Sequence, residues 1–211
     1  MDFDDKLPEL GPKQLDALKE VASIGAGNAA TSLSSMLDSK IEMTVPRVDV
    51  LPIEQVPEIM GGAEELVVAL LVGISGDIEG GVLFTLAPSS ANALVELLTG
   101  QEVTVEEGIE SLENSALKEI ANILTNSNLN AFSQMLEVQI KPQVPALTCD
   151  MKGAILEYCF VELGQVGDYA LVIETKFLSD LEKEIKGNFF LIPDPESLTT
   201  ILEKLGIRDG E

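Results

Sequence analysis

Apolar residues recur at helical spacing in four stretches of the chain, two of them long and two short. The predicted helices cover Pro12 to Leu37, Ser89 to Thr99, Ile109 to Leu136 and Pro195 to Leu205. In the third helix, Leu117, Ile120 and Leu124 fall on one side when residues are placed at about 100° each. Because such a stripe packs against a core, the sequence predicts that the long helices bury one side.

Between the helices, short apolar runs bounded by turn residues predict strands. In the first half these cover Ile41 to Leu51, Glu65 to Val72 and Gly81 to Leu86; in the second half they cover Gln139 to Leu147, Ala154 to Glu162, Ala170 to Thr175 and Gly187 to Ile192. Turn residues at Ile74 to Gly81 and at Val166 to Asp168 indicate hairpins. Because tight hairpins join antiparallel strands, the fold class is α+β rather than doubly wound α/β.

The order of elements repeats because the sequence itself is duplicated. At a shift of 99 positions, Ala17 to Ile24 lies over Ala116 to Ile123. Further matches at this shift are Met36 with Met135, Leu37 with Leu136, Ile41 with Ile140, and Pro46 with Pro145. At a shift of 106, Gly81, Phe84, Leu86 and Gly100 meet Gly187, Phe190, Ile192 and Gly206. The difference of seven residues predicts a longer hairpin in the second half.

The duplication predicts how the domain is organised. We expect residues 1–211 to form a single domain of two repeats, at about 12–100 and 109–206, each a helix–three-strand–helix unit. The repeats are expected to share one core and an antiparallel sheet, with the two long helices on one face and a pseudo-two-fold axis between the halves.

Several classes of protein are made less plausible by what the sequence lacks. It has no histidine, which excludes Ser-His-Asp and Cys-His catalysis and most zinc sites. Cys149 and Cys159 lie in apolar segments, which is typical of buried free thiols rather than of a disulfide framework. The longest apolar run, Leu66 to Ile74, is far shorter than a membrane span. The acidic start of the chain is unlike a secretion signal, so we expect a cytoplasmic protein.

The formal net charge of -23 bears on the partners of the chain. Such a field repels phosphate backbones and anionic lipid surfaces, so neither nucleic acid nor membrane is expected as a partner. The charge is otherwise compatible with a solvated acidic surface that has no specific role.

The second long helix carries a polar stripe opposite its apolar side. Ser115, Glu119, Asn122 and Asn126 cluster there, and Glu119 and Asn122 are neighbours at a separation of three residues. Asparagine costs several tenths of a kcal/mol in a helix relative to alanine, and this stripe offers no structural compensation. Taken alone, however, a Glu/Asn pair on a helix is more often ordinary surface than a site.

Two other motifs have structural interpretations. Gly25-Ala26-Gly27-Asn28 faintly resembles a phosphate-binding loop, but it lies within a helical pattern with no strand before it. Close packing of the first long helix against a neighbour explains these glycines better. Asp77 and Glu79 fall in a predicted turn, where acidic residues satisfy the backbone more often than they bind ligands.

The stripe resembles the signature of the CheC and CheX chemotaxis phosphatases. That signature is Asp or Ser, Glu four residues later, Asn three residues after it, and Pro 23 residues beyond. The second half matches it with Ser115, Glu119, Asn122 and Pro145; the first half has Asp16, Glu20 and Pro46, with Ser23 in place of Asn. The presence of two motif copies in one chain resembles CheC rather than CheX, and the resemblance covers nearly the whole chain.

The resemblance implies a substrate and roles for the site residues. The substrate is the aspartyl phosphate of the response regulator CheY, which carries its own magnesium and lysine. The resemblance therefore implies that this chain has no metal or cofactor of its own. Asn122 is implied to hold the attacking water in line with phosphorus, and Glu119 to meet the lysine of the regulator. Because serine is shorter than asparagine, the first site, with Glu20 and Ser23, is expected to be catalytically weak or inactive, although Glu20 can still dock the regulator.

The sequence leaves two other functions open. The chain could be a non-catalytic adaptor that binds the receptor deamidase CheD, CheY or both, or it could be related to flagellar switch proteins that contain this domain. The sequence ends at Glu211, soon after the last predicted helix, which argues against the extra module of a switch protein. Resemblance to CheC also implies a monomer.

Overall fold

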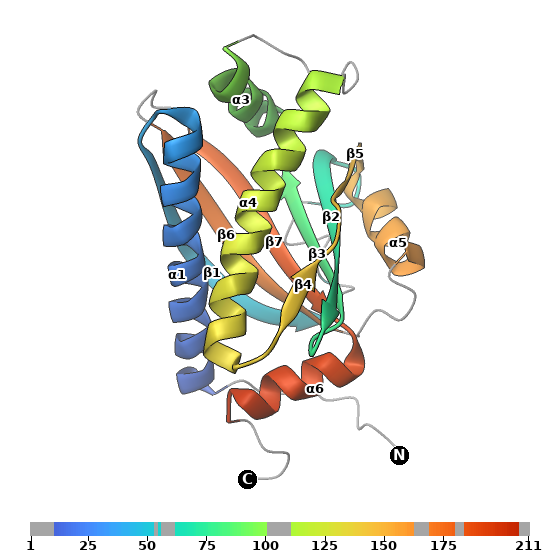
Figure 1. The fold of residues 1–211 in the computed structure, drawn as a ribbon. Helices are drawn as coiled ribbons and strands as arrows, with labels where there is room; N and C mark the ends of the chain where they lie inside the picture. The colour runs from blue at the N-terminus through green and yellow to red at the C-terminus, as the bar shows by residue number, and fades with distance from the viewer. Residues whose placement is uncertain are drawn as a thin grey trace.

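The computed structural model of the chain describes residues 11–52, 55, 62–100, 111–162, 169–179 and 184–206. Five helices and seven strands are assigned within these residues (Figure 1). In chain order they are α1 (Pro12–Leu37), β1 (Ile41–Pro52), β2 (Leu66–Gly76), β3 (Gly80–Leu86), α3 (Pro88–Thr99), α4 (Ser111–Leu136), β4 (Ile140–Pro142), β5 (Ala146–Met151), α5 (Lys152–Glu162), β6 (Tyr169–Ser179), β7 (Glu184–Pro193) and α6 (Pro195–Lys204). The predicted α+β class is confirmed.

Prolines mark the starts of three helices. Pro12, Pro88 and Pro195 occupy the first turns of α1, α3 and α6. Proline suits this place because its fixed φ is helical and its missing N–H would have no partner within the helix. At α6, the side chain of Asp194 also accepts a hydrogen bond of 2.7 Å from the backbone N–H of Ser197, a typical N-cap.

The two long helices end in the same way, at positions 99 residues apart. Asp38 and Glu137 follow α1 and α4 with positive φ values of 46° and 52°. The next N–H then donates back to the helix, from Ser39 to the carbonyl of Ser34 at 3.3 Å and from Val138 to that of Ser133 at 3.1 Å. This closure matches the C-terminal motifs that satisfy the last carbonyls of a helix.

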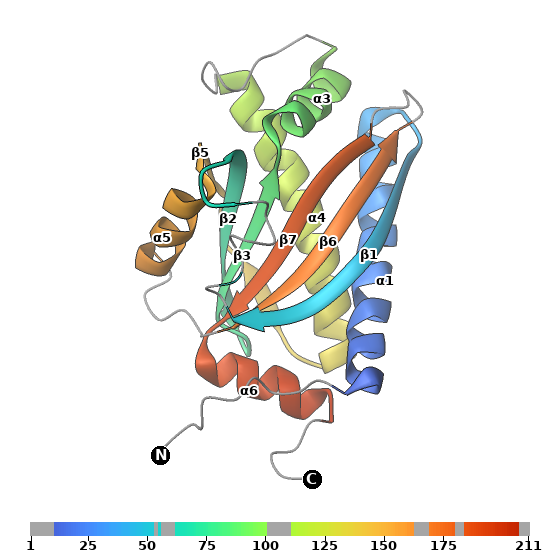
Figure 2. The same ribbon diagram turned by 180° about the vertical axis from the view of Figure 1, so that it is seen from behind.

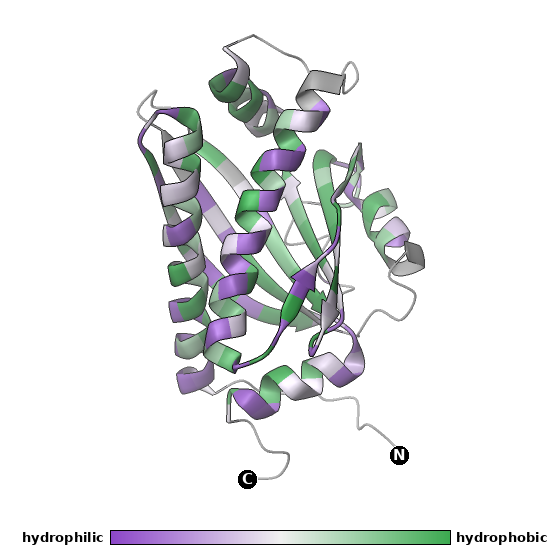
Figure 3. Cartoon of the chain, in the orientation of Figure 1, coloured by the Kyte–Doolittle hydropathy of each residue, from purple (hydrophilic) through white to green (hydrophobic). Residues whose placement is uncertain are grey.

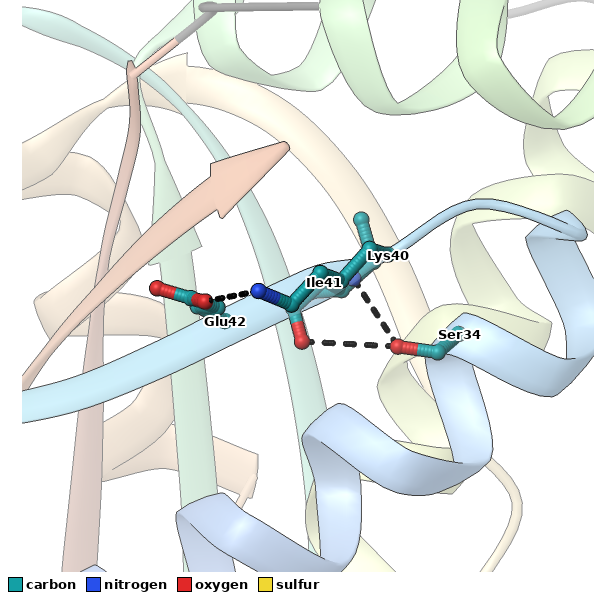
Figure 4. Close-up of polar contacts among 4 residues, drawn as sticks. All are labelled: Ser34, Lys40, Ile41 and Glu42. Atoms are coloured by element: carbon teal, nitrogen blue, oxygen red, sulfur yellow. Dashed lines mark hydrogen bonds and ion pairs between the residues drawn. The ribbon is translucent and has the colours of Figure 1, made fainter. Parts of the chain in front are cut away.

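The first of these turns is tied to the following strand by a side chain. The backbone N–H of Ile41 donates to Oγ of Ser34 at 2.9 Å, and the hydroxyl donates to the carbonyl of Ile41 at 3.4 Å (Figure 4). The exposed ion pair between Lys40 and Glu42 lies beside it, at 2.5 Å. The start of β1 is therefore held level with the last turns of α1.

The strands form one antiparallel sheet whose order reflects the duplication (Figure 2). The order is β1-β6-β7-β3-β2-β4, and β5 also pairs with β2. Between the two repeats, β1 is equivalent to β4 and β5 together, β2 to β6, and β3 to β7. With these equivalences, the strand order is the same when it is read from either edge of the sheet, as a pseudo-two-fold axis between β3 and β7 requires.

The edge strands repeat the same register, including one irregularity. On one edge Thr44 lies opposite Lys176 and Arg47 opposite Glu174, so one extra residue is inserted in β1. On the other edge, the pairs Ile74–Pro142 and Leu71–Ala146 leave three residues of the β4–β5 link opposite two of β2. Pro46 and Pro145 lie within these bulges, where a missing N–H costs no ladder hydrogen bond.

Each face of the sheet has its own apolar core. The larger core lies under α1, α3 and α4, and includes alternate residues of β2 such as Val68, Leu70 and Val72. The smaller core lies under α5 and uses the intervening residues Val67 and Ala69. The prediction that both long helices cover one face is confirmed (Figure 1). Within the described residues, no helix is both long and apolar enough to cross a bilayer.

The strand predicted over Ala154 to Glu162 is wrong, because these residues belong to helix α5. Ile155, Leu156 and Cys159 are all buried against the sheet, at a spacing that places them on one side of a helix. A short apolar run fits a strand and a buried helix equally well from sequence. The second half thus departs from the predicted helix–three-strand–helix unit, and its predicted strand over Gln139 to Leu147 is divided into β4 and β5.

The seven extra residues of the second half do not all lie in its hairpin. The link from β5 to β6 spans residues 152–168, whereas that from β1 to β2 spans 53–65, which accounts for four of them. The remaining three lie after β6, consistent with a longer hairpin, although residues 163–168, with the predicted turn at Val166 to Asp168, and 180–183 fall outside the described residues.

Gly25 allows close packing of α1 against α4. A Cβ atom at this position would lie 2.7 Å from Oδ1 and 3.0 Å from Cα of Asn128 on α4. The predicted packing role is therefore confirmed for Gly25. Gly27 has no atom within 4 Å of its Cβ position and is exposed, so packing does not explain it.

These two glycines form a matched pair for a stability test. We expect Gly25→Ala to destabilise the protein by about 1–3 kcal/mol, because the backbone of α4 has to move. Gly27→Ala is expected to stabilise it by about 0.5–1 kcal/mol, since alanine is the better helix former and meets no neighbour. Urea unfolding of both variants measures the difference, and equal stabilities would contradict this account of the helix contact.

Candidate functional site

The polar stripe of α4 faces solvent, as the sequence predicts. Ser115, Glu119 and Asn126 are exposed, and Asn122 is partly exposed. On the other side of the helix, Leu117, Ile120 and Leu124 are buried in the larger core; no more than 1% of each is exposed. Figure 3 shows hydrophilic residues along the outward side of α4 and apolar residues towards the sheet. The burial of one side fixes which side chains the helix presents.

Glu119 and Asn122 lie one turn apart on α4, and their side-chain polar groups have no partner within the described part of the chain. The side chain of Asn126 donates to the backbone carbonyl of Asn122 at 2.7 Å, which leaves the Asn122 carboxamide itself uninvolved. Among the described residues, neither Glu119 nor the amide of Asn122 forms a hydrogen bond or ion pair. A carboxylate and a neutral amide are therefore available together to a partner.

The corresponding positions on α1 differ in one respect. Glu20 and Ser23 are both exposed, so the fold places them as it places Glu119 and Asn122. The hydroxyl of Ser23, however, donates to the carbonyl of Lys19 at 2.7 Å within its own helix. This bond turns the hydroxyl back along α1, so Ser23 presents a shorter group that already has a partner.

The side chain of Asp77 has the structural role predicted for it, whereas Glu79 contributes its backbone. Both backbone and side chain of Asp77 bond to Gln139: its N–H donates to the carbonyl of Gln139 at 2.8 Å, and Oδ2 accepts from the N–H of Gln139 at 2.8 Å. The N–H of Glu79 donates to Oγ of Ser197 at 2.7 Å. These bonds tie the β2–β3 hairpin to the starts of β4 and α6. In the described parts of the chain, no three acidic or cysteine side chains gather as metal ligands would.

A cavity lies on the far face of the sheet from the polar stripe. Its volume is about 300 Å³, and its lining includes Leu83 from β3, Thr148 from β5, and Tyr158 and Cys159 from α5. Burial raises the pKa of the Cys159 thiol to about 12. The thiol is therefore protonated and unreactive at neutral pH. The predicted buried thiol is confirmed for Cys159, whereas Cys149 is only partly buried.

The raised pKa predicts slow alkylation of Cys159 in the folded protein. With iodoacetamide at pH 7.5 (about one unit below the ordinary thiol pKa), we expect Cys149 to react first. Cys159 should react quickly only after unfolding in urea, where the thiol is no longer buried and its pKa returns to the ordinary value. Mass spectrometry of digests taken over time measures both rates. Equal rates for Cys159 with and without urea would show that the thiol is not desolvated.

Comparison with known proteins places these observations in a family. The profile of the CheC-like family matches residues 14–49 and 112–148, which are the two copies of the long helix with the strand region that follows. The chain is 33% identical over 197 residues to the protein named CheY-P phosphatase CheC of Bacillus subtilis, covering 92% of this chain and 94% of that protein. The chain belongs to the CheC-like family.

A further relative and a solved structure extend the comparison for this CheC-like chain. The protein named flagellar motor switch phosphatase FliY of Bacillus subtilis is 25% identical over 141 residues, which are 66% of this chain and 36% of that protein. The crystal structure of Thermotoga maritima FliY superposes with a TM-score of 0.75 at 21% identity, covering 94% of this chain and 98% of that chain. The shared fold is thus one that flagellar switch proteins also contain.

The structure brings the predicted site residues together only within each half. Glu119 and Asn122 lie on α4, while Glu20 and Ser23 lie on α1, which runs antiparallel beside it (Figure 1). Sequence reasoning missed the bulges that follow each helix. The matching prolines Pro46 and Pro145 could have predicted them. A proline within an edge strand favours a bulge, because its missing N–H interrupts the ladder of hydrogen bonds.

Proposed function

We propose that this CheC-like chain is a phosphatase that hydrolyses the aspartyl phosphate of the response regulator CheY at the Glu119–Asn122 pair. The name of the Bacillus subtilis relative supports the substrate. The observation that supports the site is the carboxamide of Asn122, which is partly exposed and has no partner among the described residues. An amide that the fold leaves unpaired in mid-helix is available for a bound partner.

The chemistry requires little of this chain. An acyl phosphate is already activated, so the reaction needs a water molecule held in line with phosphorus. As the water oxygen bonds to phosphorus, the bond to the aspartate oxygen breaks, leaving a carboxylate and inorganic phosphate. The Asn122 amide accepts a hydrogen bond from this water or donates one to it, and it adds no negative charge beside the phosphoryl oxygens. Such positioning supplies a rate factor on the order of 10²–10³.

Glu119 has a docking role in this proposal. It lies one turn before Asn122, where its carboxylate meets the active-site lysine of the regulator. An ion pair at that point sets how deeply α4 enters the pocket and so sets the height of the Asn122 amide. The magnesium ion of the reaction belongs to the regulator, and this chain contributes no ligand to it.

The first half is a docking position without catalysis in this proposal. Glu20 is presented as Glu119 is, but Ser23 donates its hydroxyl to Lys19 and reaches less far than an amide. Binding of CheD, a role in a flagellar switch, a cytoplasmic location and a monomeric state remain predictions from sequence.

Substitutions at the two equivalent positions test the proposal. We expect Asn122→Ala to lower the rate of CheY dephosphorylation about 100-fold, because the water is no longer oriented. Ser23→Ala should change the rate less than twofold, since its hydroxyl bonds only to its own helix. The measurement is the decay of radiolabelled phospho-CheY at fixed concentrations of each variant.

The controls separate catalysis from folding. Ser23 is exposed and Asn122 is partly exposed, so both variants should keep the free energy of unfolding of the wild type within about 1 kcal/mol. Equal losses of rate in the two variants would contradict the asymmetric site. Full activity of Asn122→Ala would remove the catalytic role of the amide.

A further inference from the structure

The bulges that follow the two long helices place equivalent valines in opposite environments. Val45 and Val144 occupy the same position in the register, next to Pro46 and Pro145. Val45 is packed in the larger core with 8% of its surface exposed, whereas Val144 is 86% exposed. The prolines show the reverse, because Pro46 is exposed and Pro145 is buried. The second bulge therefore presents its valine to solvent, whereas the first bulge buries it.

Val144 is held in this position on both sides. Before it, the N–H of Gln143 donates to the carbonyl of Gly73 at 2.8 Å, and the side chain of Gln143 lies over Gly73, where a Cβ would be 2.7 Å from Oε1. After it, Pro145 is buried and Ala146 pairs with Leu71 of β2. Because the side chain of Val144 is held in contact with water, it does not gain the free energy of burial that Val45 gains in the core.

The second bulge lies beside the turn of α4 that carries the site. The chain reverses at Val138, whose N–H donates to the carbonyl of Ser133. Six extended residues from Val138 to Val144 cover about 20 Å. About thirteen helical residues cover the same length, which leads back from Ser133 to Ile120, between Glu119 and Asn122. Contacts of α4 with both β4 and β5 agree with this level, and Figure 1 shows them side by side.

The charge of the chain makes an apolar contact useful at this place. With a formal net charge of -23, the protein does not attract a phosphorylated acidic pocket over long range. Affinity for such a partner has to come from short-range contacts. A rigidly held valine at the edge of the site offers apolar area that costs little conformational entropy to bind.

We propose that Val144 is an apolar docking contact for the phosphorylated response regulator, covered by the regulator surface that surrounds its phosphoaspartate pocket. The proposal rests on the proposed function, because it assumes that the regulator docks on α4. It also gives a second reason to expect no catalysis at the first half. There, Val45 is buried, so a regulator that docks at Glu20 meets neither the amide nor this apolar contact.

Two variants test this docking contact with the full-length chain and phosphorylated CheY. We expect Val144→Ser to raise KM about tenfold and to leave kcat within about twofold, because it removes binding area without touching the water. Ser23→Asn in the Asn122→Ala background should recover less than a tenth of the lost activity, since it restores an amide without the contact. Steady-state curves over a range of phospho-CheY concentrations give both constants.

Met151→Ser is the control, because Met151 is also an exposed apolar residue, at 52%, but lies at the end of β5, away from both helix stripes. It should leave KM and kcat unchanged. An unchanged KM in Val144→Ser, alongside an active wild type, overturns the docking contact and leaves the proposed function intact. A wild type that does not accelerate phospho-CheY decay overturns the proposed function instead. A dimer of the wild type that Val144→Ser dissociates would assign the valine to self-association and overturn the proposal.

Discussion

The contact between α1 and α4 at Gly25 is the constraint on which the site depends. Asn128 of α4 lies against the backbone of α1 there, so close that no larger residue than glycine fits without movement. Asn128 is also buried and donates to the carbonyl of Leu124 at 2.8 Å. Rotation of α4 about its axis would break this close contact. The contact therefore helps to hold α4 in the orientation in which Glu119 and Asn122 lie on the side away from the core.

The duplicated halves share a framework and differ in what they present. The sheet order, the register of the edge strands and the ends of α1 and α4 are equivalent in both. Besides the additional helix α5, two local differences bear on the site: serine against asparagine on the helix, and a buried against an exposed valine at the bulge. In our proposals, the first half is a structural partner that completes the sheet and the core, while the second half carries the catalytic amide.

The sequence predicts those features that depend on periodicity and on single residues with strong preferences. The long helices follow from apolar spacing, and the starts at Pro12 and Pro195 follow from proline. The outward direction of Asn122 follows from the position of Leu117 and Ile120 on the same helix. Helix α5 was missed because a short apolar run is compatible with either a strand or a buried helix, and only the uncovered face of the sheet decides between them. The environment of Val144 could not be predicted, because Val45 and Val144 are each followed by proline at the same place in the repeat, and this Val-Pro pair does not distinguish a buried valine from an exposed one.

A structure of this chain in complex with CheY in a beryllofluoride-activated state tests the central claim most directly. The account predicts that α4 enters the phosphoaspartate pocket, with the Asn122 amide within hydrogen-bonding distance, about 3 Å, of the position from which water attacks. A complex in which the regulator binds elsewhere on the chain, with Asn122 left facing solvent, would contradict it.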